Sequence, residues 1–67
     1  MTVFIGVFDE GGRLVKTLCD GDREPGKHLL EWNGSMDRGG RAPSGTYYLQ
    51  VEIKGVGIVA RYRIVLE

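Results

Sequence analysis

The chain has 67 residues and a mass of 7.4 kDa, which allows one small domain and excludes dinucleotide-binding folds, β/α barrels and kinases. Nine basic and nine acidic side chains give a formal net charge of zero, which argues against a nucleic-acid partner. The 42% of apolar residues excludes a disordered chain, and no apolar run is long enough for insertion into a membrane.

Apolar runs separated by glycine-rich turns predict an all-β protein. They indicate about five strands, at residues 2–8, 13–19, 27–32, 46–54 and 58–66. In the first run Val3, Ile5 and Val7 share one face, while Phe4 and Phe8 lie on the opposite face. A hairpin turn is expected between the first two strands, although the apolar spacing of the second (i, i+1, i+4) would also suit a helical turn.

The third predicted strand follows a polar loop and places Leu30 and Trp32 on one face. The polar loop, residues 20–26, contains acidic side chains but lacks the remaining ligands of a calcium loop, so we expect a solvated turn. Residues 33–45 follow without apolar periodicity, and a segment of that length should be internally ordered or functional. Trp32 is expected in the core beneath it.

The last two predicted strands alternate most clearly. In the fourth, one face carries Tyr47, Leu49, Val51 and Ile53. In the fifth, the face opposite the apolar residues carries Val59, Arg61 and Arg63. Antiparallel hairpins of this kind predict a small β-sandwich or partial barrel.

Several motifs recur in a characteristic order. They are a strand ending in Asp9 with Gly12-Arg13-Leu14 after it, Pro25-Gly26 leading into Leu30-x-Trp32-x-Gly34, then Asp37-x-Gly39 and Arg41-x-Pro43-Ser44-Gly45-x-Tyr47. This order resembles the FlgD-type immunoglobulin-like domain of the bacterial flagellar hook-capping protein. The resemblance implies a single Ig-like domain over residues 1–67, and its relatives lie in secreted and cell-surface proteins of bacteria.

The resemblance implies a structural or assembly module, not an enzyme. Ser44 is not in a Gly-x-Ser-x-Gly motif, and no ligand set for a metal is present, so we expect no catalytic residue, cofactor or metal site. A small carbohydrate-binding module, using an exposed ring such as Tyr48, is the alternative.

Self-association is expected because domains of this family usually begin with a further strand, which the chain does not show before Thr2. An unpaired strand edge would then be open. The alternative is a closed barrel that encloses Phe4 and Phe8. We therefore predict a protein partner, a second copy of the chain, with an interface of Phe4, Phe8, Val59, Arg61 and Arg63.

The remaining assignments concern the interior and the long loop. The predicted core consists of Val3, Ile5, Val7, Leu30, Trp32, Tyr47, Leu49, Val51 and Ile53. The loop is expected to be ordered by Asp37, Gly39, Pro43 and Gly45, with the Asp37 carboxylate accepting hydrogen bonds from the backbone that follows it. The Tyr47 hydroxyl is expected to bond back to the loop backbone.

Overall fold

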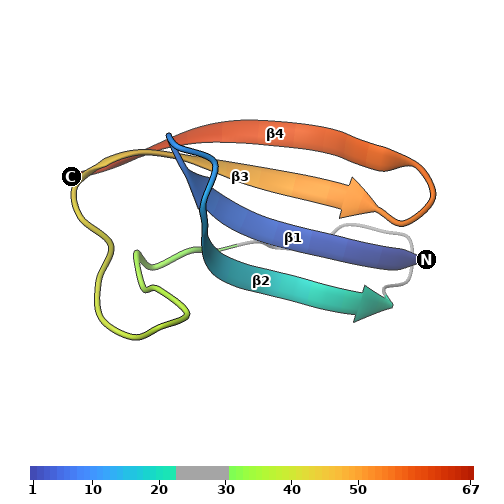
Figure 1. The fold of residues 1–67 in the computed structure, drawn as a ribbon, viewed down its shortest axis with the longest axis horizontal. Coiled ribbons are helices and arrows are strands. Elements are labelled where there is room, and N and C mark those ends of the chain that lie inside the picture. Colours follow the sequence, from blue (N-terminus) through green and yellow to red (C-terminus); the bar gives the residue numbers. More distant parts are fainter. Residues whose placement is uncertain (23–30) are drawn as a thin grey trace.

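The computed structural model describes residues 1–22 and 31–67 of the chain. Its strands are β1 (Thr2–Asp9), β2 (Leu14–Asp22), β3 (Gly45–Ile53) and β4 (Gly57–Leu66). They form one sheet with the order β2-β1-β3-β4, in which every neighbouring pair is antiparallel (Figure 1). The all-β antiparallel class is confirmed, with four strands in a single sheet across the described residues.

The second and third strands depart most from the sequence prediction. β2 continues past the expected end at Cys19 as far as Asp22, because these residues pair with the start of β1. The Thr2 hydroxyl donates to Asp22 Oδ1 at 2.8 Å and fixes this end. The predicted strand at 27–32 lies mostly outside the described residues, and Trp32 at its end belongs to no strand.

One face of the sheet, here called the inner face, forms the core. Directly paired residues of antiparallel strands point to the same side, so Val7 meets Leu49 and Ile5 meets Val51 on this face. The buried apolar residues are Val3, Ile5, Val7, Ala42, Tyr47 and Leu49. Val51 and Ile53 are half-buried beside them, and Leu30 lies outside the described residues.

The opposite, outer face carries Phe4 and Phe8, both half-buried. Gly6 lies between them, and a Cβ there would come within 2.8 Å of Phe4 Cε2 and 2.9 Å of Leu14 Cδ1. The absence of a side chain at Gly6 therefore lets the side chains of Phe4 and Leu14 pack over β1. β2 and β4 are the two edges of an open sheet, so the described residues do not enclose the phenylalanines in a barrel.

The β1–β2 turn is organised by Asp9. Its Oδ1 atom accepts hydrogen bonds from the amides of Gly11 and Arg13, both at 2.9 Å. The Asp9 carbonyl also accepts from the Gly12 amide at 3.0 Å, which closes the turn. The Asp-x-x-Gly motif thus turns the chain by satisfying its own backbone donors.

We expect Asp9→Ala to destabilise the protein by roughly 1 kcal/mol, because two backbone amides lose their acceptor. Asp9→Asn keeps Oδ1 and should cost much less. Urea denaturation of both variants measures the difference. Equal losses in the two would show that the carboxylate charge, not the hydrogen bonds, stabilises the turn.

Candidate functional site

A loop of residues 31–44 covers one end of the inner face. Figure 1 places it at the end of the sheet where the β1–β2 turn lies. Ser35 and Arg41 form an antiparallel bridge within the loop, and the Ala42 amide donates to the Gly34 carbonyl at 2.7 Å. The loop is therefore a small hairpin, and Ala42 inserts into the core from it.

Two aromatic rings fasten this loop to the sheet. Tyr47 on β3 is buried, and its hydroxyl donates a hydrogen bond to the Pro43 carbonyl oxygen. Trp32 packs edge-on against Tyr47, with ring centroids 5.1 Å apart and an interplanar angle of 63°. The indole Nε1 donates to the Ser35 carbonyl at 2.8 Å, so the chain turns directly after Trp32.

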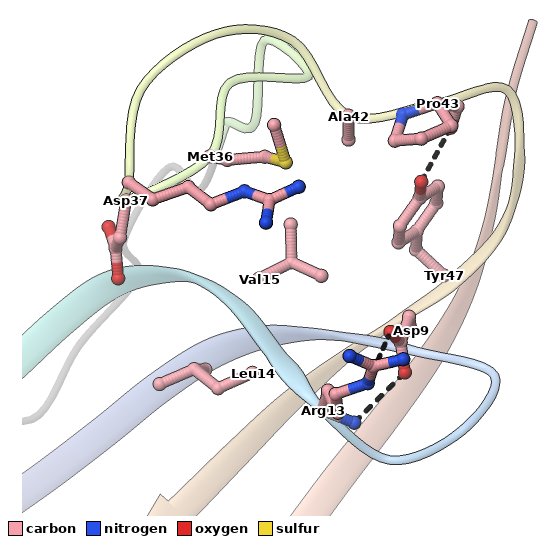
Figure 2. Close-up of a pocket in the computed structure, with 10 residues that line it drawn as sticks. Asp9, Arg13, Leu14, Val15, Met36, Asp37, Ala42, Pro43 and Tyr47 are labelled. Carbon is pink, nitrogen blue, oxygen red and sulfur yellow. Dashed lines mark hydrogen bonds and ion pairs between the residues drawn. The ribbon is translucent and has the colours of Figure 1, made fainter.

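A pocket of about 370 Å³ lies between the loop and the β1–β2 hairpin. Val15, Met36 and Pro43 are apolar residues of its lining (Figure 2). Arg13 and Arg38 also line it. Asp9 and Asp37 line it as well, so the two basic side chains of the lining are balanced by two acidic ones. Across the described residues, no three acidic, histidine or cysteine side chains are grouped to hold a metal ion.

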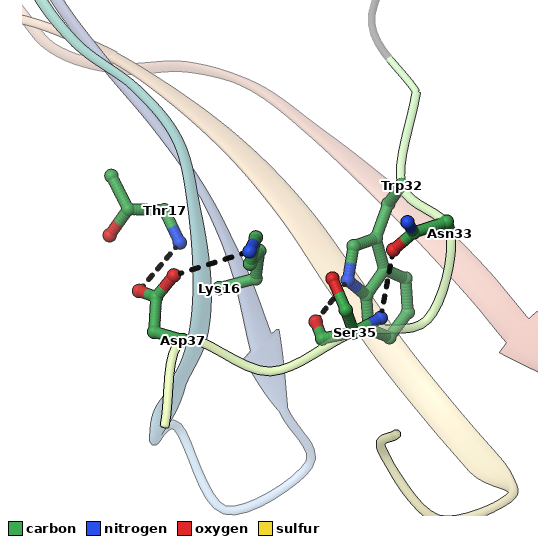
Figure 3. A network of polar contacts seen from close by, with 6 residues as sticks. All are labelled: Lys16, Thr17, Trp32, Asn33, Ser35 and Asp37. Carbon is green, nitrogen blue, oxygen red and sulfur yellow. Dashed lines mark hydrogen bonds and ion pairs between the residues drawn. The ribbon is translucent and has the colours of Figure 1, made fainter. Parts of the chain in front are cut away.

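Asp37 attaches the loop to the edge strand β2. Its Oδ2 atom accepts from the Thr17 amide at 2.9 Å, and its own amide donates to the Val15 carbonyl at 3.0 Å. Lys16 Nζ lies 3.7 Å from Asp37 Oδ1 (Figure 3). Asp37 thus bonds to β2 through one donor and one acceptor, as a neighbouring strand would.

The outer face carries a second polar cluster beside Phe8. Gln50 is only 7% exposed, and Arg61 Nε donates to its Oε1 atom at 2.9 Å. The Arg61 guanidinium lies over the Tyr48 ring, 5.5 Å from the centroid, and so occupies a ring face on which a carbohydrate would stack. Arg63 is exposed at the neighbouring outward position.

β4 is the second edge of the sheet and carries much of the exposed apolar surface. Ile58, Val59, Tyr62 and Val65 are 48–62% exposed along it. Beyond β4 the sheet ends, within the described residues, so a row of backbone N–H and C=O groups faces outward. Long apolar edges of this kind pair with other strands unless they are covered.

The fold and its exposed edge define a small antiparallel β domain whose candidate site is a surface for protein association. A sequence model described as the FlgD Ig-like domain matches residues 1–55, and the chain belongs to this family. The comparison with curated proteins finds no match, and neither does the comparison with solved structures. The match ends in the β3–β4 turn, so β4 lies beyond the part of the chain that the family describes.

The predicted interface residues lie on the outer face but in two groups. Phe4 and Phe8 are on β1, while Arg61 and Arg63 are on β4, and β3 separates them. Val59 is displaced from their alternation, because the β3–β4 register shifts between Val51 and Glu52 and leaves Val59 without a direct partner. The interface prediction therefore covers two strips of surface.

The expected action of Asp37 needs correction. The carboxylate was expected to bond to its own following backbone, but its acceptor atoms face Thr17 and Lys16 of β2. Gly39, with φ +99°, instead shapes the loop turn by donating its amide to the Met36 carbonyl at 3.0 Å. No local pattern in the sequence signals a contact between residues this far apart along the chain.

Helices are absent from the described residues, and with them any helical segment able to cross a bilayer.

Proposed function

We propose that this chain is a non-catalytic structural module that associates with protein, including a second copy of itself, through the exposed edge of β4. The observation that carries the proposal is the exposed apolar strand β4, in which Ile58, Tyr62 and Val65 are all more than half exposed. Backbone groups along such an edge supply hydrogen bonds to an added strand. Membership in the FlgD Ig-like family, a family of structural and assembly domains, supports the same function.

The acidic side chains beside the pocket already have structural tasks, which lends catalysis no support. Asp9 accepts the amides of the β1–β2 turn, and Asp37 accepts the Thr17 amide. A general acid or base has to be available to a substrate, and these carboxylates are committed to the backbone. Association through a strand edge requires neither a general acid nor a general base.

The test compares lysine substitutions at two exposed valines. We expect Val65→Lys, on β4, to weaken association at least tenfold, because a lysine on an edge strand opposes strand pairing. Val56→Lys is the matched control, since Val56 is 72% exposed but lies in the β3–β4 turn. Light scattering coupled to size-exclusion chromatography, over a wide dilution range, measures the mass.

A folded monomer at every concentration would overturn self-association. Equal weakening by both lysines would show that general surface hydrophobicity, not the edge, brings the copies together. Far-ultraviolet circular dichroism of each variant establishes that the fold is retained, so that a change in mass reports on association alone.

A further inference from the structure

The two edges of the sheet differ in a way that decides how copies can combine. At β2, the Thr17 amide and the Val15 carbonyl are already bonded to Asp37, at 2.9 and 3.0 Å. The far half of β2 carries Asp20 and Asp22, both exposed, which would repel a second β2. β4 has neither obstacle in the described structure.

This difference between β2 and β4 decides whether copies can add to one another without limit. The strand directions alternate across β2-β1-β3-β4, so β4 of one copy could meet β2 of the next in an antiparallel pair, and repetition would give a filament. Arg61 and Arg63 on β4 and Asp20 on β2 have complementary charges, which would favour that contact. Asp37 occupies the first half of the β2 edge, at Val15 and Thr17, and would have to be displaced for this contact.

Building on the proposed function, we infer that two copies of this chain form a closed two-fold pair, β4 against β4, with Arg61 of each copy opposite Glu67 of the other, and that Asp37 closes β2 against further addition. A two-fold interface uses the same surface on both copies, so of the strand edges in the described residues it leaves the two β2 edges exposed. The assembly then stops at two.

Charge disfavours one register of this pair and favours another. In an antiparallel pair centred on Tyr62, Arg61 would face Arg63 of the second copy, twice, and like charges directly opposite are destabilising. Centring the pair on Ile64 places Arg61 opposite Glu67 instead, which follows the last residue of β4 and would extend the strand by one position. It also places Arg63 opposite Val65, whose exposed surface the arginine stem can cover.

The inner face supports the same register. Residues 62, 64 and 66 point to this face, because they pair with inner-face residues of β3. In a pair centred on Ile64, Tyr62 lies opposite Leu66 of the second copy. Tyr62 is 59% exposed in the single chain, so the pair buries apolar area that is otherwise in water.

The first test reverses one charge. Glu67→Lys would place a lysine opposite Arg61 twice in each pair, and we expect the dimer dissociation constant to rise roughly tenfold. Glu10→Lys is the matched control: Glu10 is exposed in the β1–β2 turn, and the net charge changes equally. Sedimentation equilibrium of both variants and the unmodified chain gives the constants. Equal constants for the two variants would overturn the Ile64 register.

The second test frees the Thr17 amide of β2 by removing the Asp37 carboxylate. We expect the unmodified chain to reach twice 7.4 kDa and no more, and Asp37→Ala to form particles larger than this. Asp37→Asn keeps an oxygen for the Thr17 amide and should remain a pair. If the Asp37→Ala variant remains a pair, the closure of β2 is overturned while self-association stands. Growth of the unmodified chain beyond a pair would have the same meaning. A monomeric unmodified chain would overturn the proposed function as well.

Hydrogen exchange provides a measurement that does not depend on whether Asp37→Ala folds. On dilution from pair to monomer, amides of β4 should lose protection, while the Thr17 amide keeps it because Asp37 is its partner in both states. Loss of protection at Thr17 together with β4 would show that β2 takes part in the contact, and would overturn the inference.

Discussion

Replacing Tyr47 with alanine is expected to unfold most of the protein at room temperature. Tyr47 is 5% exposed and packs with Val7 and Ala42, and its ring supports Trp32. Removing a buried aromatic ring costs about 3–5 kcal/mol. A domain of this size rarely has more than about 3–5 kcal/mol of stability to lose.

Tyr47→Phe separates the ring from its hydroxyl. Only the hydrogen bond to the Pro43 carbonyl is lost, so we expect a cost of about 1 kcal/mol and a folded protein. Urea denaturation followed by tryptophan fluorescence measures both variants, since Trp32 contacts the altered ring. A fully folded Tyr47→Ala protein would mean that the 31–44 loop holds to the sheet without its aromatic anchor.

We expect Gly34→Ala to lower the free energy of unfolding more than Gly39→Ala, which is its control. Both glycines have a left-handed φ, +86° at Gly34 and +99° at Gly39, which costs an alanine about 1–2 kcal/mol. A Cβ at Gly39 meets nothing within 4 Å. At Gly34 it would lie 2.8 Å from Arg41 Nη2 and force that side chain to move.

The moving side chain makes Gly34 the more costly site. Arg41 Nη1 donates to the Asn33 carbonyl at 3.0 Å, and we expect this exposed bond to be lost as the flexible side chain moves, adding about 0.5–1 kcal/mol. The difference between the two unfolding free energies is the quantity to measure. If it is zero, the close approach at Gly34 is relieved without breaking the Arg41 hydrogen bond, and only the backbone conformation matters.

The strands with strict alternation were predictable from the sequence, and the irregular positions were not. Tyr47, Leu49 and Val51 keep to one face because a side-chain period of two is a local property. Val59 escaped prediction because a register shift depends on the partner strand. The extension of β2 to Asp22 was missed for the same reason, since polar residues enter a strand when a neighbour pairs with them.

The candidate site was only partly predictable. An open edge could be expected from strand content, but which strand forms it depends on sheet order, and β1 at the centre puts β2 and β4 outside. The contact of Asp37 with Thr17 joins a loop to a strand across a long stretch of chain, and pairwise contacts of that range leave no periodic trace. The predicted bond from the Tyr47 hydroxyl to the loop backbone is confirmed at Pro43, whereas the contact between the loop and β2 was not predicted.

The central position of β1 also shapes how the chain can fold. β1–β2 and β3–β4 are local hairpins, but isolated hairpins are marginally stable at best in water. The β1–β3 ladder joins residues such as Val7 and Leu49, which are distant in sequence, and loop-closure entropy opposes its formation. We therefore expect folding to be limited by formation of the β1–β3 ladder between the two hairpins. Substitutions along the β1–β3 seam should slow folding, whereas those in the outer strands should mainly speed unfolding.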